Sequence, residues 1–172
     1  KHGFAFPDTT NETHAFRHAR ELAMPTAPGK SPPTAAAGYS GKPLWQKLGL
    51  KPGLRVRLAH TPDDYFSLCD FDPAQVALIA RKADACDFTH VFATRRAALE
   101  RDLPGLIAGL ADKGALWVSW PKKSAKVATD ISEDTLREIA LPLGLVDIQV
   151  CAVTEVWSAL KFVRRKTDAK TP

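Results

Sequence analysis

The chain has 172 residues, of which 45% are hydrophobic and 25% charged, and its formal net charge is +5. These values are typical of one globular domain plus a tail, and the modest positive charge permits a polyanionic partner. Three widely spaced cysteines without a Cys-x-x-Cys pair argue against a disulfide framework and a zinc knuckle. No run approaches the roughly 20 apolar residues of a membrane span. We therefore expect a cytoplasmic protein with reduced core thiols and no membrane partner.

Residues 1–41 differ in composition from the rest of the chain. They are rich in Pro, Thr, Ala and Gly and contain only scattered apolar residues. Such a segment buries too little surface to offset its chain entropy, so we expect a disordered or upstream tail. The only methionine is Met24, and one hypothesis is that it is the natural start and that residues 1–23 lie upstream of it.

A single α/β domain is expected over residues 42–166, followed by a basic tail over 167–172. Apolar periodicity and turn residues predict helices and strands in alternation. In chain order we expect a strand over 55–59, a helix over 63–69, a strand over 88–93, a helix over 95–110, a turn at 112–114, a strand over 115–120, a helix that begins near Ser132, and strands over 146–153 and 157–163.

Three details of this pattern matter later. Residues 73–81 fit either a helix that starts at Asp72-Pro73 or a buried strand, and the sequence leaves both open. Pro104 with Gly105 can kink or divide the helix around them. The last two strands are joined by only three residues, which predicts an antiparallel pair.

Two segments resemble the class I S-adenosylmethionine (SAM)-dependent methyltransferase fold: LADKGALWVS at 110–119 and LGLVDIQV at 143–150. The resemblance implies a Rossmann-like, mostly parallel sheet of about five to six strands that ends in an antiparallel hairpin. A second resemblance, to the bacterial domain of unknown function 3052, covers residues 42–166. It is carried by KPLWQKLGLKPG at 42–53, LWVSWPKK at 116–123, VATD at 127–130, ALPLGLVD at 140–147 and WSALKFV at 157–163. That family implies the fold but no activity.

The turn after the first expected strand departs from the methyltransferase pattern. Residues 61–65 read TPDDY and contain no glycine, although only glycine lets backbone N–H groups approach a phosphate or ribose closely. Residues 78–82 contain no carboxylate for ribose hydroxyls. We therefore expect no bound cofactor.

Polar and basic residues follow several of the expected strands. In doubly wound sheets ligands bind beyond the carboxyl ends of the strands, and Arg and Lys are suited to phosphate or carboxylate. The candidate ligand-binding residues are His60, Thr94, Arg95, Arg96, Trp120, Lys122 and Lys123. The alternative is that these residues bind no ligand, because polar residues commonly occur where strands end.

The WPKKS loop at 120–124 combines an aromatic face with two positive charges, which could hold a nucleotide or nucleic-acid phosphate. Against this, Trp117 and Trp120 cannot share one face of a strand, so at least one is expected in the core. His90, inside an apolar strand, is expected to be a core residue, and Ser132 to cap a helix. The sequence shows no metal-ligand spacing, Walker loop or Gly-x-Ser-x-Gly elbow.

Three functional hypotheses follow. The favoured one is a non-catalytic, methyltransferase-like module that binds an anionic small molecule or a macromolecule. The second is a SAM-dependent methyltransferase with an atypical cofactor loop. The third is a nucleic-acid-binding protein that uses the basic strand ends and the C-terminal tail, with an affinity that falls steeply with salt.

Overall fold

The computed structural model describes residues 41–82 and 84–166. The predictions made for residues 1–40 and for the tail at 167–172 lie outside the described residues.

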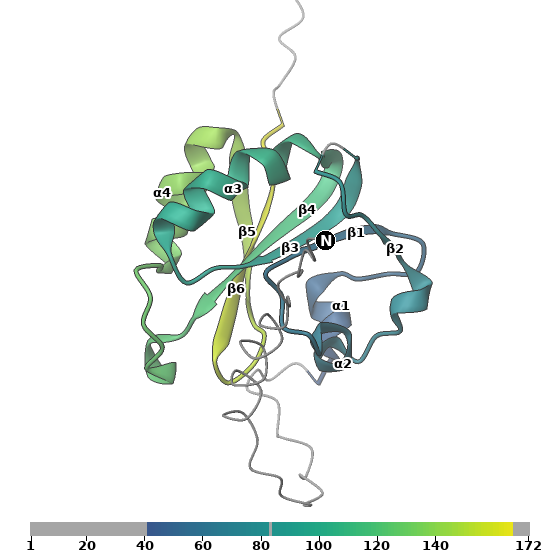
Figure 1. Cartoon of the computed structure of the whole chain (residues 1–172), viewed down its shortest axis with the longest axis horizontal. Helices are drawn as coiled ribbons and strands as arrows, with labels where there is room; N and C mark the ends of the chain where they lie inside the picture. Colours follow the sequence, from purple (N-terminus) through teal and green to yellow (C-terminus); the bar gives the residue numbers. More distant parts are fainter. Residues whose placement is uncertain (1–40, 83, 167–172) are drawn as a thin grey trace, which may run out of the picture. The chain divides into compact units, whose positions relative to one another are not determined.

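Six strands form one mixed sheet in the order β2-β1-β3-β4-β6-β5 (Figure 1). The strands are β1 (Arg55–Ala59), β2 (Ala77–Leu78), β3 (Cys86–Phe92), β4 (Leu110–Pro121), β5 (Leu145–Ala152) and β6 (Trp157–Arg164). The first four in chain order pair in parallel, whereas β6 is antiparallel to both of its neighbours. The structure therefore confirms a Rossmann-like, methyltransferase-like α/β fold with an antiparallel C-terminal pair.

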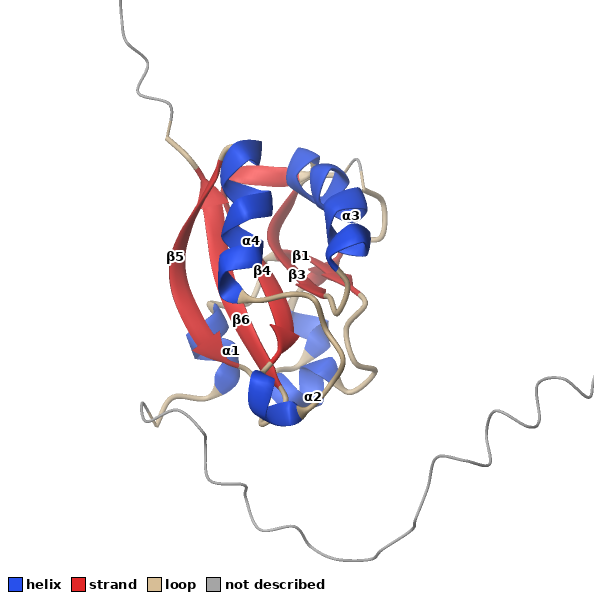
Figure 2. Cartoon of the chain, turned by 90° about the vertical axis from the view of Figure 1, so that its left-hand side faces the viewer, coloured by secondary structure: helices blue, strands red, loops and turns tan. Residues whose placement is uncertain are grey.

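Helices cover both faces of this sheet. The α-helices are α1 (Leu44–Leu48), α2 (Tyr65–Cys69), α3 (Arg96–Ala108) and α4 (Glu133–Ala140), and the 3-10 turns are Pro73–Gln75, Lys123–Ala125 and Leu141–Leu143. Helices α3 and α4 lie together over one face (Figure 2), and α1 and α2 pack on the other. Ser132 caps α4 as predicted, because its side chain accepts a hydrogen bond from the Thr135 N–H.

The two faces carry separate hydrophobic cores. Leu99, Leu103 and Leu136 belong to the α3–α4 core, while Leu48 and Tyr65 belong to the α1–α2 core. Both cores meet the central strand β4, whose side chains alternate between the faces.

Trp117 and Trp120 show this alternation directly. Trp117 is fully buried in the α1–α2 core and donates its indole N–H to the Leu48 carbonyl at 2.8 Å. Trp120 is 8% exposed in the α3–α4 core. The prediction that the two face opposite sides is confirmed, and both are core residues.

The predicted turn at 112–114 is wrong as a boundary, because these residues lie within β4. Leu110 pairs with Cys86 and Ala115 pairs with Phe88, so the extra residues of β4 bulge out without ending the strand. Gly114 fits this bulge because a Cβ there would lie 2.8 Å from Leu110 Cδ1. A bulge and a turn use the same residue types, which is why the sequence did not separate them.

Both interpretations of residues 73–81 were partly right. Asp72 caps a 3-10 turn at Pro73–Gln75, since its Oδ1 accepts a hydrogen bond from the Ala74 N–H at 2.9 Å. The chain then forms the two-residue strand β2, but both of its residues are exposed, so the expected burial of this strand is wrong. Pro104 does not divide α3, which runs unbroken from Arg96 to Ala108 and is held on the sheet by its buried leucines.

Candidate functional site

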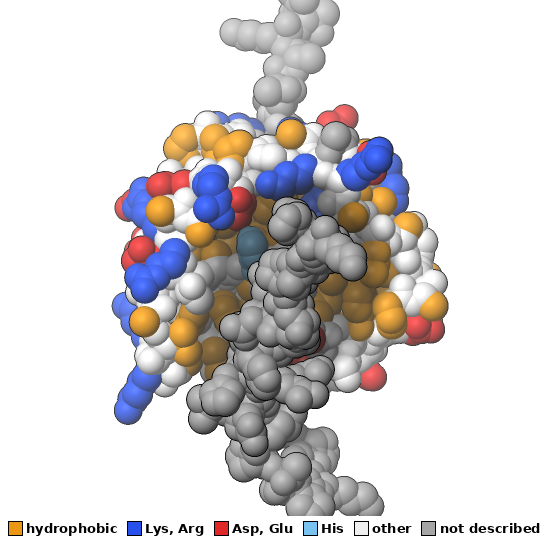
Figure 3. All heavy atoms as spheres, viewed as in Figure 1, with side chains coloured by type: hydrophobic (Ala, Val, Ile, Leu, Met, Phe, Trp, Pro, Cys, Tyr) orange, Lys and Arg blue, Asp and Glu red, His pale blue; other side chains and the backbone are white. Residues whose placement is uncertain are grey.

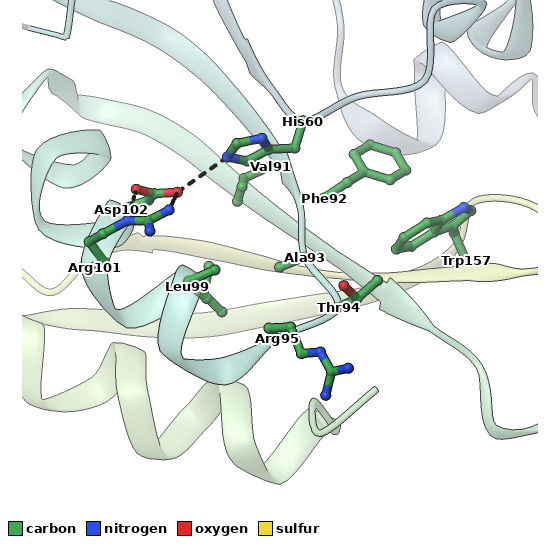
Figure 4. Close-up of a pocket in the computed structure, with 11 residues that line it drawn as sticks. His60, Val91, Phe92, Ala93, Thr94, Arg95, Leu99, Arg101, Asp102 and Trp157 are labelled. Atoms are coloured by element: carbon green, nitrogen blue, oxygen red, sulfur yellow. Dashed lines mark hydrogen bonds and ion pairs between the residues drawn. The ribbon is translucent and has the colours of Figure 1, made fainter. Parts of the chain in front are cut away.

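A cavity of about 330 Å³ lies at the carboxyl ends of β1 and β3 (Figure 4). After β1 the chain turns toward β2 on one side, and it later returns to form β3 on the other side of β1. The connections that follow these two strands therefore diverge, which leaves a crevice between them. Such a switch point is where ligands bind in open α/β sheets.

The wall of the cavity is mainly apolar. Val91 and Leu99 line it from β3 and α3, and Phe92 and Trp157 form its aromatic side. The ring centroids of Phe92 and Trp157 are 5.0 Å apart with an interplanar angle of 70°, an edge-to-face pair. The space-filling view shows a histidine beside a hollow surrounded by hydrophobic side chains (Figure 3). Of the histidines that the structure describes, His60 is exposed and lines the cavity, whereas His90 is fully buried.

One corner of the cavity is polar. His60 Nε2 lies 3.2 Å from Asp102 Oδ2, and Arg101 Nε donates to Asp102 Oδ1 at 3.1 Å. The hydrogen bond from Arg101, and then that from His60, lowers the pKa of the Asp102 carboxyl. A carboxylate at this corner therefore neutralises part of the positive charge around it.

His60 has a left-handed backbone conformation, with φ of 54°. This conformation is strained for a residue with a Cβ, although histidine tolerates it better than most residues. The turn after β1 thus keeps the kind of backbone that a glycine would favour, but it carries an imidazole whose side chain is 64% exposed.

The structure brings three of the predicted site residues together. His60, Thr94 and Arg95 all line the cavity. Arg95 makes no ion pair with any residue that the structure describes. Their roles in binding stay predictions, but their proximity follows from the parallel pairing of β1 with β3.

Arg96 lies elsewhere, contrary to the predicted convergence of basic residues. Its guanidinium pairs with Glu100 and Glu138, each at 2.8 Å, on the side that faces α4. The Arg96 N–H donates to Asp130 Oδ1 at 2.6 Å, so a carboxylate already occupies the N-terminal end of α3. Neither group is free to bind an anion in the cavity.

The residues predicted after β4 are separated from the cavity. Trp120 and Lys123 line a second hollow, of about 540 Å³, that also contacts residues 129–134. Three carboxylates lie along that segment (Asp130, Glu133 and Asp134), which disfavours an anion there. Lys122 lines neither hollow, and its backbone N–H donates to the Val156 carbonyl at 2.7 Å.

Sequence reasoning missed Asp102 and the aromatic pair. A helical signal was available for part of this set, because Leu99 and Asp102 are three residues apart and so share one face of α3, while Arg95 precedes that helix as its N-cap residue. No local pattern connects Asp102 with His60, or Trp157 with Phe92, because these pairs meet only through the sheet.

His90 is a satisfied core residue, as predicted. Its Nδ1 lies 2.9 Å from the Tyr65 hydroxyl and its Nε2 2.7 Å from the Ser119 hydroxyl, and all three side chains are buried. Burial lowers the pKa of His90 to about 3, so the ring is neutral at ordinary pH. The network joins β3 and β4 to α2, and none of its three side chains lines the cavity.

The remaining predictions about ligating residues concern cysteines and metals. Cys69, Cys86 and Cys151 are free and buried, as expected. Over 41–82 and 84–166, no cluster of three or more His, Cys, Asp or Glu side chains could hold a metal ion. Within the same ranges, none of the helices combines the length and apolar character of a membrane span.

Among the comparisons with known proteins, only the one with solved structures found matches. No protein-family model matches the chain, so membership of domain of unknown function 3052 stays a prediction, and no curated protein matches either. LepI in complex with SAM is similar with a TM-score of 0.45 and 14% identity; the match covers 71% of this chain but only 39% of LepI.

Two methylases are also similar in structure. Ribosomal protein L11 methylase from Lactobacillus delbrueckii subsp. bulgaricus matches with a TM-score of 0.48, 12% identity and coverage of 70% of this chain and 74% of that one. A TehB-like SAM-dependent methyltransferase from Corynebacterium glutamicum matches with a TM-score of 0.46, 11% identity and coverage of 70% and 85%. At these values the likeness concerns the arrangement of the elements alone, and no activity is carried over.

Proposed function

We propose that the chain is a non-catalytic, methyltransferase-like binding module whose ligand is a small anion with an apolar or aromatic body. The observation that carries this proposal is the cavity of about 330 Å³ between the carboxyl ends of β1 and β3. Its position is that of ligand sites in open α/β sheets, and its size is within the range of small-molecule pockets.

The charges around the cavity support an anionic ligand. Arg95 and Arg101 line it together with the single carboxylate of Asp102, and that carboxylate is shared between Arg101 and His60. Apart from His60, the lining carries two positive charges and one negative charge. The apolar wall around Phe92 and Leu99 favours a ligand that also buries carbon surface.

The residues present do not fit SAM at its ribose. Residues 61–65, which follow β1, contain no glycine, and residues 79–82, which follow β2, contain no carboxylate that could accept ribose hydroxyls. The proposal therefore assigns no methyl transfer to this site.

The test uses the fluorescent probe 1-anilinonaphthalene-8-sulfonate, which combines an aromatic body with one anionic group. We expect saturable binding to the full chain, weakened about tenfold or more by Arg95→Ala, because a charged hydrogen bond contributes about 1.5–3 kcal/mol. Ala98→Leu, which fills the cavity from α3, is expected to weaken it as well. Arg165→Ala is the matched control, since Arg165 is exposed and lies outside the cavity. Equal loss in the control, or no loss in either cavity variant, would contradict the proposal.

A SAM-dependent methyltransferase with an atypical cofactor loop is the second candidate. It is favoured by the left-handed backbone of His60, which preserves a turn of the kind that glycine forms after β1. Isothermal titration with SAM and with its demethylated product separates the two proposals. Micromolar binding of either compound, lost in Ala98→Leu, would overturn the non-catalytic module in favour of the methyltransferase.

A further inference from the structure

Several lysines come from segments on the α1 side of the sheet, and none of them lines the switch-point cavity. Lys47 lies in α1, Lys51 follows that helix, Lys122 follows β4, and Lys161 lies in β6. We call these four residues the lysine cluster. Lys51, Lys122 and Lys161 form no ion pair with any residue within the described ranges.

Lys161 lies at the centre of this cluster. Its Nζ is 5.7 Å from the centroid of the buried Trp117 ring, and a Cβ placed on Gly49 would lie 3.9 Å from the same atom. The ammonium group therefore rests against the end of α1, two residues before Lys51. Gln149, the cross-strand partner of Lys161, donates a long hydrogen bond of 3.5 Å to the Lys47 carbonyl.

Acidic residues are missing from the segments that supply the lysines. Residues 41–53, 121–128 and 157–164 contain seven lysines and no Asp or Glu. The one carboxylate of β5, Asp147, is hydrogen-bonded to Arg137 of α4 at 3.0 Å, on the other face. Other carboxylates lie close to these segments: Asp70 and Asp72 share a hollow with Pro52, the neighbour of Lys51, and Glu155 precedes Val156, whose carbonyl accepts the Lys122 N–H. The three segments themselves thus carry an excess of positive charge.

The electrostatic interactions agree with this geometry. Burial, and then the charge of Lys51, lowers the pKa of Lys161. Burial raises the pKa of Cys151, and the charges of Lys47 and Lys122 oppose that rise. Lys51 therefore acts on Lys161, and Lys47 and Lys122 act on Cys151. Positive charge concentrated in this way favours an anionic partner.

We propose that the lysine cluster binds the phosphate backbone of nucleic acid without regard to base sequence. Several ammonium groups on one surface suit a polymer that presents phosphates at regular spacing. Trp117, the aromatic ring beneath Lys161, is fully buried and cannot stack on a base, so contact is with the backbone. This surface uses residues other than the basic strand ends that the sequence indicated, apart from Lys122, and does not depend on the cavity ligand.

The test is fluorescence anisotropy of a labelled DNA duplex of mixed sequence titrated with the full chain. We expect binding at about 50 mM salt that weakens with a log–log slope of about −3, corresponding to roughly three phosphate contacts. The double variant Lys51→Gln/Lys161→Gln is expected to bind about tenfold more weakly, with a slope reduced by about 2. Lys51 is exposed and Lys161 is half-buried over Trp117, so a thermal melt of the double variant checks that it folds like the parent chain.

Lys113→Gln/Arg165→Gln is the matched control, because both side chains are exposed and neither belongs to the lysine cluster. It removes two positive charges, as the test variant does, and should change neither affinity nor slope. Equal weakening in the control would show that net charge alone attracts DNA, and the proposal would fail. It would also fail if the chain did not retain the duplex but bound vesicles of anionic phospholipid, since the partner would then be a membrane surface.

Discussion

His60 Nε2 and Asp102 Oδ2 lie 3.2 Å apart across 42 residues of sequence and join the end of β1 to α3. The contact places a carboxylate beside a cavity whose other charged side chains are basic. Asp102 therefore limits how strongly the cavity can attract an anion, which gives a prediction opposite in sign to that for Arg95.

Asp102→Asn is expected to increase the affinity of the anionic naphthalene sulfonate probe. The substitution removes a negative charge at the cavity, and a unit charge about 6 Å away contributes about 0.7 kcal/mol in water, or about threefold in affinity. The measurement is fluorescence titration at low salt, and the gain should shrink as salt is added. An unchanged or weaker affinity would show that the probe does not sense this carboxylate.

Gly105→Ala and Gly109→Ala are expected to change stability in opposite directions. A Cβ on Gly105 would meet only Lys82 Cδ at 3.5 Å, so alanine gains helix propensity of up to about 1 kcal/mol. A Cβ on Gly109 would lie 2.5 Å from Nη1 of Arg57 and 2.6 Å from the Lys82 carbonyl. That overlap should cost about 1–3 kcal/mol. Urea unfolding measures both changes, and equal effects would refute the packing described around Arg57.

Asp130→Ala is expected to lower the free energy of unfolding by about 1 kcal/mol. Asp130 is far from α3 in sequence, yet its carboxylate accepts a hydrogen bond of 2.6 Å from the Arg96 N–H. A helix N-cap residue normally makes this kind of hydrogen bond. Asp134→Ala is a suitable comparison, because Asp134 is 88% exposed in its ion pair with Arg137, and the loss of such a pair should cost under about 0.5 kcal/mol. Chemical denaturation of both variants tests the difference; similar losses would contradict a capping role.

His90 is expected to make the protein less stable as the pH falls from about 6.5 toward 3. The folded state keeps the ring neutral down to a pKa of about 3, whereas the unfolded chain binds a proton near pH 6.5. The unfolded state therefore gains protons first, and the loss approaches about 1.4 kcal/mol per pH unit. Urea unfolding between pH 6.5 and 5, where most carboxylates stay charged, should show this slope. His90→Gln should lose it, and a slope that persists in the variant would point to another group.

Much of the fold follows from local pattern. The alternation of apolar residues predicted the strands around Val56, Val91 and Trp117. The three-residue link before Trp157 predicted the antiparallel pair of strands at the C-terminal end, and the structure confirms both. The bulge around Gly114 was mistaken for a turn, because glycine between polar residues suits both and only the pairing with β3 decides between them.

The candidate site was predictable only where strand ends define it. The rule for parallel strands placed His60, Thr94 and Arg95 together, because β1 and β3 are neighbours. It failed for Arg96, whose side chain turns toward α4 once helix α3 begins. A helix changes the direction of consecutive side chains by about 100°, so adjacent basic residues need not converge on one ligand.

The alternation along β4 makes the tryptophans separate optical reporters. Trp45, Trp117 and Trp157 belong to or pack against the α1–α2 core, whereas Trp120 alone lies in the α3–α4 core. If Trp120 is replaced with Phe, the remaining tryptophan fluorescence reports on the α1–α2 core. If the other three tryptophans are replaced instead, the fluorescence reports on the α3–α4 core. Comparing the thermal unfolding curves of the two variants would show whether the two hydrophobic cores unfold in one transition or in two.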